Sequence, residues 1–440
     1  MKSKERSLKP KQEVMVQIST NGKAKHVDRD SIDMYLAVVT HLKHNLESRF
    51  GELYKKNVMK IFSEVVECMK DDDNCIKVFQ DAFQTLLFEP SDIPFPPPEN
   101  VKFTFIDLFA GIGGFRIAMQ SLGGKCVFSS EWDREAKKTY RLNFGEEPFG
   151  DITKDEIKKL IPDGFDVLCA GFPCQAFSIA GRRGGFEDTR GTLFFDVAEI
   201  IRKKKPKAIF LENVKGLINH DRGRTLETIL NVLRGNQEDG GLEYFVPEPQ
   251  VMNARDFGVP QNRERIFIVG FRKDLNIDDF KYPSPHKDKK AFREVKEREV
   301  PSTKYFLSTR YLQTLRNHKA RHESKGNGFG FEIIEDDSIA NAIVVGGMGR
   351  ERNLVYDDRI TNYEPETKIK GEVNREFIRK MTPREWARLQ GFPDNFRIEI
   401  SDASAYKQFG NSVAVPAIQA TAEKILSIIQ KKDNHRGERK

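Results

Sequence analysis

The stretch that decides the fold reads Phe105-Ile106-Asp107-Leu108-Phe109-Ala110-Gly111-Ile112-Gly113-Gly114. The apolar residues up to Leu108 predict a strand, the glycines predict a tight turn, and a helical pattern starts at Phe115. A strand that ends in small residues and opens a helix lets a ligand approach the backbone near the positive end of the helix. The stretch therefore predicts a ligand-binding turn in an α/β sheet.

Further strands alternate with helical stretches after this turn. Four short apolar runs lie at 126–130, 166–170, 208–211 and 265–271, and amphipathic segments separate them. This alternation is typical of a doubly wound parallel sheet with helices on both faces. We therefore expect an α/β, Rossmann-like sheet.

The flanking regions have other patterns. Residues 31–88 carry apolar positions at helical spacing and predict three helices, and five prolines between Pro90 and Pro98 predict a linker. From Lys304 to Lys325 six Lys or Arg stand against one acid, which fits either an anion-binding face or an ordinary solvated one. Helical patterning returns from Thr382, and the basic tail after Gln430 is expected to be unstructured.

Composition sets broad bounds. A chain of 440 residues is expected to form two or three domains, and a net charge of +7 permits an anionic partner without demanding one. Five cysteines, an odd number, do not suggest a disulfide framework, and Cys169 with Cys174 lacks a second pair of ligands for zinc. The Lys-rich start predicts no secretory signal, and no apolar run approaches the ~18 residues of a membrane span. We expect a reduced, cytosolic protein.

Glu131 adds a carboxylate to the glycine turn. It stands at the end of the next predicted strand, twenty residues beyond Gly111, where a carboxylate suits two ribose hydroxyls. A dinucleotide site is the alternative, but its fingerprint needs a glycine three residues after Gly113, where Arg116 stands. The combination favours an adenosyl ligand without a pyrophosphate.

A candidate nucleophile follows another predicted strand, in Gly171-Phe172-Pro173-Cys174-Gln175. A cysteine after proline at a strand end is exposed on a rigid turn, although an ordinary buried cysteine is the commoner case. Residues 175–192 are rich in Gly, Ser and Arg, the composition of a loop that could close over a substrate. This context favours the nucleophile.

Glu212-Asn213-Val214 ends a third predicted strand. Ligands gather at such strand ends in doubly wound folds, whereas the alternative is that Glu212 caps the following helix. Three strands thus deliver Gly113, Cys174 and Glu212 to one edge of the sheet.

Five blocks in this order carry a resemblance to a known family. They are Phe105–Gly114, Gly171–Ser178, Glu212–Val214, Gln261-Asn262-Arg263-Glu264-Arg265 and Gly410-Asn411-Ser412-Val413. The chain closely resembles the cytosine-5 DNA methyltransferases of bacterial restriction–modification systems from about Lys102 to Gln430. The segment Arg379–Pro393 looks like a further block.

The resemblance implies a reaction and roles. The Cys174 thiolate would add to cytosine C6, Glu212 would contact N3 and the exocyclic amine, and Arg265 would hold O2 with Arg263 in support. The methyl donor would be S-adenosylmethionine, and no metal is implied. The cofactor residues carried over are Phe109, Gly111, Gly113, Gly114, Glu131, Trp132, Asp151, Ile152, Asn411 and Val413.

The resemblance also implies a duplex DNA substrate whose target cytosine is swung out of the stack. Residues 272–378 would form the target-recognition domain, between a catalytic domain at 98–271 and its returning part at 379–430; residues 1–97 and 431–440 would be a helical region with linker and a basic tail. Gly346–Arg352 is the candidate reading loop. The DNA-contacting residues implied are Ser178, Arg190, Arg350 and Arg352. The family often has Thr and an aliphatic residue where this chain has Ala342-Ile343, so the reading residues stay open.

Two other functions compete. Relatives that methylate tRNA carry a Cys-Phe-Thr signature, whereas this chain has no cysteine beyond Cys174 and a recognition region of about a hundred residues. Residues 1–97 would make the protein a regulator of its own operon if they bound DNA through a helix-turn-helix, yet no convincing turn separates two short helices there. We expect a monomer in the bacterial cytoplasm that acts on duplex DNA, has no membrane partner and is paired with a cognate restriction endonuclease.

Overall fold

The computed structural model describes residues 16–20, 23–27, 29–69, 93–173, 193–236, 240–326, 330–346, 349–365 and 371–437. It divides into two compact units, Met1–Ser91 and Asp92–Lys440. Each unit is described by itself.

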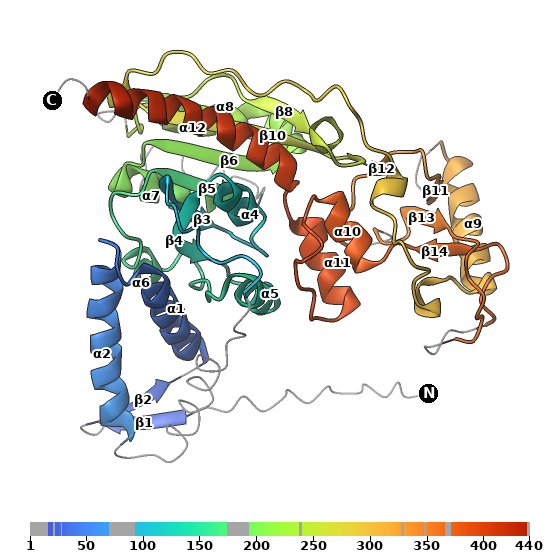
Figure 1. Ribbon diagram of the computed structural model, residues 1–440, viewed down its shortest axis with the longest axis horizontal. Helices are drawn as coiled ribbons and strands as arrows, with labels where there is room; N and C mark the ends of the chain where they lie inside the picture. Colours follow the sequence, from blue (N-terminus) through green and yellow to red (C-terminus); the bar gives the residue numbers. More distant parts are fainter. Residues whose placement is uncertain are drawn as a thin grey trace, which may run out of the picture. The chain divides into compact units, whose positions relative to one another are not determined.

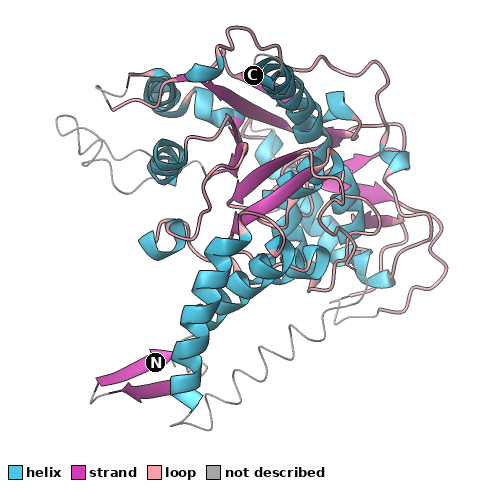
Figure 2. Cartoon of the chain, turned by 60° about the vertical axis from the view of Figure 1, so that its left-hand side comes forward, coloured by secondary structure: helices cyan, strands magenta, loops and turns pink. Residues whose placement is uncertain are grey.

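The first unit contains a hairpin and two helices (Figure 2). Strand β1 (Val16–Thr20) pairs antiparallel with β2 (Lys23–Val27), and α1 (Arg29–Asn45) packs on α2 (Gly51–Met69). The two helices confirm the periodicity of the sequence, whereas the hairpin was not predicted. The third expected helix, at residues 76–86, lies outside the described residues.

The second unit is built on a seven-stranded sheet (Figure 1). Its order is β4-β3-β5-β6-β10-β7, and β8 also pairs with β10. The strands are β3 (Phe103–Leu108), β4 (Gly124–Ser130), β5 (Val167–Gly171), β6 (Ala208–Val214), β7 (Tyr244–Phe245), β8 (Gln250–Asn253) and β10 (Glu264–Arg272). All five predicted strands exist.

The sheet is mixed, so the expectation of a wholly parallel sheet is wrong at one side. Strands β4, β3, β5 and β6 are parallel, but β10 runs antiparallel to β6 and to β8. After the helix that follows β6, strand β8 runs in the same direction as β6. Strand β10 then runs in the opposite direction and pairs with both β6 and β8. A return strand needs only a short connection, whereas another parallel strand would need a crossover.

Helices cover both faces of this sheet. Helices α4 (Gly114–Ser121) and α12 (Val415–Gly437) pack together on one face, where they share a core with alternate strand residues such as Phe105, Cys169 and Phe210. The intervening Ile106, Leu168 and Ile209 are buried as well, which requires cover on the other face. Helices α7 (Leu193–Lys204) and α8 (Arg224–Arg234) contact each other.

Helix α12 differs from two expectations. It continues to Gly437, so the prediction of an unstructured tail after Gln430 was wrong for residues 431–437. The stretch Asp402–Lys432 is also long and apolar enough to resemble a membrane span by composition alone. In the structure Ile418, Ala422 and Ile425 are buried in the core, which accounts for the apolar residues.

A smaller lobe of this unit holds residues of the region expected to recognise the target. Strands β11 (Glu332–Ile334), β13 (Asn353–Tyr356) and β14 (Ile378–Lys380) form a sheet beside α9 (Thr309–Glu323). A separate small core joins them. It consists of Leu307, Leu312, Leu315, Phe331, Leu354 and Ile378.

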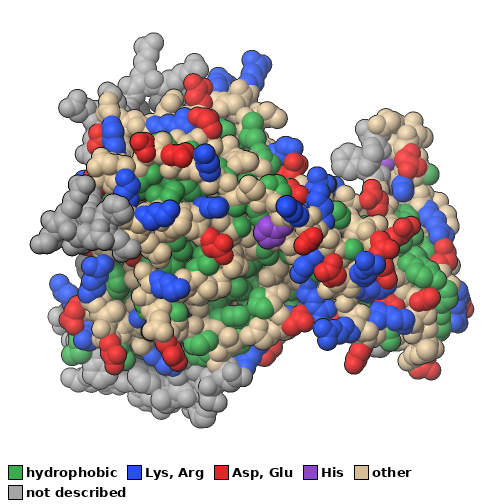
Figure 3. Space-filling model, turned by 45° about the horizontal axis from the view of Figure 1, so that its top comes forward, with side chains coloured by type: hydrophobic (Ala, Val, Ile, Leu, Met, Phe, Trp, Pro, Cys, Tyr) green, Lys and Arg blue, Asp and Glu red, His purple; other side chains and the backbone are tan. Residues whose placement is uncertain are grey.

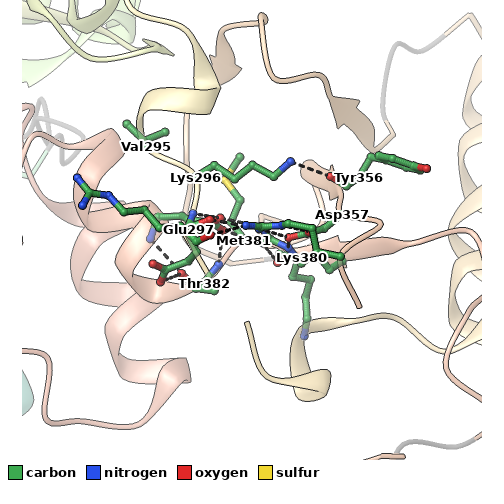
Figure 4. A network of polar contacts seen from close by, with 12 residues as sticks. Val295, Lys296, Glu297, Tyr356, Asp357, Lys380, Met381 and Thr382 are labelled. Carbon is green, nitrogen blue, oxygen red and sulfur yellow. Dashed lines mark hydrogen bonds and ion pairs between the residues drawn. The ribbon is translucent and has the colours of Figure 1, made fainter. Parts of the chain in front are cut away.

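A buried ion network ties the smaller lobe to α10 (Pro383–Leu389) (Figure 4). Arg379 of β14, whose side chain is fully buried, donates to Asp357 at 2.8 Å and to both oxygens of Glu385 at 2.7 and 2.8 Å. Glu385 also closes a capping box with Thr382 at the start of α10. The network fixes the end of β14 on the helix that follows it.

The proline-rich stretch expected as a linker packs on the second unit at its C-terminal end. The Phe95 backbone N–H donates to the Asn143 carbonyl at 3.0 Å, and its ring lies 5.8 and 6.1 Å from those of Phe144 and Phe396. Residues 93–98 are therefore part of the folded unit.

The remaining elements complete the second unit. The helices are α5 (Arg134–Phe144), α6 (Asp155–Lys158) and α11 (Asp402–Asn411), and strands β9 (Gln261–Asn262) and β12 (Ala340–Asn341) form a short parallel pair. Short 3₁₀ turns lie at Lys215–Ile218, His220–Gly223, Ala254–Phe257, Lys273–Leu275, Phe292–Glu294 and Thr303–Tyr305.

Candidate active site

The ends of β5 and β6 meet the segment after α11. Gly171 is the register partner of Glu212, and a Cβ added at Gly171 would lie 3.5 Å from Glu212 Oε2 and 3.8 Å from Val413 Cγ1. Parallel strands end at the same edge of a sheet, which is why residues 41 positions apart come together. The structure thus gathers three of the five sequence blocks at one point.

Cys174 lies outside the described residues, as do Ser178 and Arg190. The chain is described up to Pro173, and the residue before it is held firmly. Asn213 Nδ2 donates to the Phe172 carbonyl at 2.8 Å, and the rings of Phe172 and Phe194 lie 5.9 Å apart. Asn213, whose sequence block was singled out only for Glu212, therefore anchors the turn that leads to Cys174.

Glu212 is buried and paired. Its Oε1 lies 3.1 Å from Arg265 Nε, and no side chain caps the 3₁₀ turn that follows β6. This geometry does not fit the alternative in which Glu212 is a helix cap. Burial raises the pKa of Glu212, and the charges of Arg265 and Arg263 oppose that rise. The carboxyl group consequently keeps a proton to higher pH than an exposed glutamate does and can donate it to a ring nitrogen.

Arg263 points into the protein. Its Nη1 donates to the Ile343 carbonyl at 2.9 Å, and its Nη2 donates to the carbonyls of Gly410 and Ser412 at 3.0 and 2.7 Å. Burial and the neighbouring Arg265 lower the pKa of Arg263 to about 9, so it stays charged at neutral pH. Its support for the site is therefore exerted through backbone carbonyls.

The glycine turn after β3 is held by Glu131. Phe109, Gly111 and Gly113 all have positive φ, at 56°, 55° and 86°. The N–H groups of Gly111 and Asp133 donate to the two oxygens of Glu131 at 2.8 and 2.7 Å. A Cβ at Gly111 would meet nothing within 4 Å, so open space lies beside the turn and next to a fixed carboxylate.

Close packing explains two of the glycines. A Cβ at Gly113 would lie 2.2 Å from the Phe144 ring, and one at Gly114 would lie 2.7 Å from Val413 Cγ2. The first turn of α4 therefore rests directly on the segment after α11. Asn411, the last residue of α11, is exposed, and Val413 in the segment that follows is buried.

The other predicted cofactor residues flank the turn. Trp132 is 77% exposed, an unusual state for so large an apolar ring. The backbone N–H of Glu131 donates to the Phe149 carbonyl at 2.8 Å, which brings residues 150–152 to the end of β4. Asp151 accepts from the N–H and hydroxyl of Thr153, and Ile152 is buried. An open turn, a carboxylate and an exposed aromatic ring together fit an adenosyl group.

Asp107 was missed by the sequence reasoning. It is fully buried in β3, and among the described residues neither of its oxygens has a hydrogen-bond partner. Burial raises the pKa of Asp107 to about 8, against the charge of Arg116, so the group is largely neutral at pH 7. An acid between the apolar residues Ile106 and Leu108 of this strand was the signal that could have found it.

The candidate reading loop presents two arginines. Arg350 and Arg352 are exposed, and Arg350 lies 5.9 Å from the centre of the Tyr406 ring. Gly347 and Met348 of this loop lie outside the described residues. Lys and Arg side chains gather around the narrowing that leads to the smaller lobe (Figure 3). In the described ranges no group of three or more His, Cys, Asp or Glu could hold a metal ion.

Comparison with known proteins places this site in a family context. Residues 103–427 match the family model described as C-5 cytosine-specific DNA methylase. The chain is 70% identical to the type II methyltransferase M.HpaII of Haemophilus parainfluenzae, over 81% of this chain and 98% of that protein. It is 45% identical to the type II methyltransferase M1.ScrFI of Lactococcus lactis subsp. cremoris, over 84% of this chain and 92% of the relative.

Solved structures show the same fold at lower identity. A methyltransferase from Entamoeba histolytica superposes with a TM-score of 0.55 at 20% identity, covering 74% of this chain and 98% of that one. A mutant of the DNMT2 protein from Spodoptera frugiperda gives a TM-score of 0.54 at 21% identity, over 74% of this chain and all of the other.

Proposed function

The chain belongs to the C-5 cytosine-specific DNA methylase family, and from this premise we propose how its residues divide the work of the reaction. It is a DNA (cytosine-5-)-methyltransferase that uses S-adenosylmethionine as methyl donor. One observation carries the assignment of roles. Gly171, Glu212 and Val413 meet at one edge of the sheet, and Gly171 lies three residues before Cys174 in the chain.

Cys174 is the nucleophile in this proposal. Its thiolate adds to C6 of a flipped-out cytosine, and the electron pair moves to C5. Protonated Glu212 donates to N3 as that happens, which its raised pKa favours, and Arg265 holds both Glu212 and the carbonyl O2. C5 takes the methyl group, a base removes the C5 proton, and the thiolate leaves as the double bond re-forms.

The glycine turn holds the methyl donor. When bound, S-adenosylmethionine supplies a sulfonium methyl group, which needs no metal to be transferred. Glu131 suits the two ribose hydroxyls, Trp132 offers its exposed face to the adenine, and Asp151 suits the adenine amine. The remaining contacts of the turn are assigned to Phe109, Gly111, Gly113, Gly114, Ile152, Asn411 and Val413.

We assign the DNA contacts to the loop after Cys174 and to the smaller lobe. Arg350 and Arg352 are exposed and suit guanine edges or phosphates. Ser178 and Arg190 are assigned to the DNA side of the closing loop. In the cell, the enzyme protects bacterial DNA in the cytoplasm from a cognate restriction endonuclease, and it acts as a monomer.

The test is methyl transfer from isotope-labelled S-adenosylmethionine to duplex DNA, with mapping of 5-methylcytosine. Methylation at one short motif is expected, and Cys174→Ser should abolish it. Cys169→Ala is the matched control, because that thiol is buried within β5. Transfer to bulk tRNA in place of duplex DNA would overturn the assignment of the substrate.

A further inference from the structure

Three buried polar side chains form a cluster behind the active site. Gln261, Arg263 and Gln390 are 0%, 2% and 0% exposed, and we call them the polar hub. They come from β9, from the turn before β10 and from the end of α10. Arg263 Nε has no hydrogen-bond partner among the described residues, but the other bonds of these buried groups are costly to break, so each bond constrains the segment that it reaches.

The first arm of the hub holds the root of the reading loop. Gln261 Oε1 accepts from the Ile343 N–H at 3.0 Å, and Arg263 Nη1 donates to the Ile343 carbonyl at 2.9 Å. Both backbone polar groups of Ile343 are thus bound to the hub. Ile343 is completely buried and lies seven residues before Arg350.

The second arm holds the segment that closes the cofactor site. Arg263 Nη2 donates to the Gly410 and Ser412 carbonyls at 3.0 and 2.7 Å, and Gln390 Nε2 donates to the Phe409 carbonyl at 2.7 Å. The next residue, Val413, packs on Gly114 at the start of α4. The same side chains therefore fix the wall of the cofactor site.

Besides Arg263, two further contacts join the two arms. Gln261 Nε2 donates to Gln390 Oε1 at 3.2 Å, and a Cβ at Gly410 would lie 2.6 Å from Val345 Cγ2. A shift of the loop root would leave hub groups unpaired unless the segment at 409–412 moved with it. The two segments are therefore mechanically linked.

We propose that Gln261, Arg263 and Gln390 are positioning residues that couple duplex DNA at Arg350 and Arg352 to the cofactor at the Gly114–Val413 contact. The inference rests on the proposed function, because it takes the segment around Arg350 and Arg352 to contact DNA. Each ligand orders one arm and, through the hub, the other. Thermodynamic linkage then requires each ligand to tighten the other by the same factor.

The experiment measures the dissociation constant of S-adenosylhomocysteine, an unreactive probe, without DNA and with a saturating duplex that contains the mapped methylation site. For the full-length protein we expect about fivefold or more tightening by the duplex. Arg263→Lys keeps the charge but lacks the fork that reaches both arms. The duplex should tighten probe binding to this variant less than twofold, whatever the affinity of the variant for the probe without DNA.

Arg384→Lys is the matched control, because the Arg384 guanidinium reaches carbonyls of a single segment, Pro393 and Phe396. It should keep the full tightening. Gln390→Asn, whose amide is one methylene too short, gives a second test should Arg263→Lys not fold. If the hub were merely structural, the variants would bind the probe more weakly by the same factor with and without DNA. The ratio of the two dissociation constants would then equal that of wild type, and this result overturns the proposal. So does a wild-type ratio of one, whereas failure to methylate any duplex would instead refute the proposed function.

Discussion

Removing the Arg379 guanidinium should cost much of the stability of the joint between the smaller lobe and α10. In Arg379→Met, four hydrogen bonds are lost, three of them to the buried carboxylates of Asp357 and Glu385. In this variant Asp357 still accepts a hydrogen bond from Arg359 at 2.7 Å. Glu385 still accepts from the backbone N–H groups of Thr382 and Glu297 at 2.8 and 3.0 Å. Breaking a buried pair in this way costs about 3–5 kcal/mol, because a charge is left without its partner.

The chain offers a local probe for this change. It has two tryptophans, and Trp386 is buried next to Glu385, so Trp132→Phe leaves a single tryptophan, on α10. Urea unfolding followed by this fluorescence reports the free energy of unfolding of the joint. The duplex KM of Arg379→Met should rise as well, because β14 loses its fixed place on α10.

Two further variants decide whether charge burial is the cause. Arg379→Met with Glu385→Gln should regain at least half of the lost stability, since the uncompensated charge is gone. Arg316→Met breaks the exposed pair with Glu376 and should cost less than about 1 kcal/mol. A cost below about 1 kcal/mol for Arg379→Met, or no recovery in the double variant, would refute the reasoning.

Three other predictions follow from the site and the joint. Glu212→Gln cannot donate a carboxyl proton to N3 and should lower kcat by about 10²–10³-fold in single-turnover methyl transfer, with cofactor affinity unchanged; a loss under tenfold would contradict the role. Gly114→Ala places a Cβ 2.7 Å from Val413 and should weaken the binding of S-adenosylhomocysteine about tenfold, as measured by calorimetry. In the control Gly216→Ala the nearest atom is 3.9 Å from the new Cβ, so this variant should bind S-adenosylhomocysteine as wild type does. Burial alone would raise the pKa of Asp357, but hydrogen bonds from Arg359 and Arg379 lower it to about 2. The stability from this depressed pKa is present above pH ~4 and is lost as pH falls toward 2, so wild type should lose about 2 kcal/mol relative to Asp357→Asn over that range. A pH-independent difference in urea unfolding would count against it.

The sequence by itself determined the main strands of the larger unit and the family to which the chain belongs. Strands were found because their residues form short apolar runs, and the turn after β3 was found because only glycine tolerates its positive φ without strain. The blocks that carry Gly113 and Glu212 were placed at one sheet edge, since neighbouring parallel strands end together. These are local or topological rules that a single chain displays.

Only the tertiary structure decided how distant segments pair. The antiparallel β10 could not be foreseen, because an apolar run has no direction until its neighbours are known. Arg116, which stands where a dinucleotide fingerprint has glycine, is buried 2.5 Å from Glu146, thirty residues away. Arg263 and Arg265 cannot be told apart in the sequence. In the structure Arg265 faces Glu212, whereas Arg263 donates to the backbone carbonyls of Ile343 and Gly410. Desolvation and long-range hydrogen bonds set these orientations, and both exist only once the chain has folded.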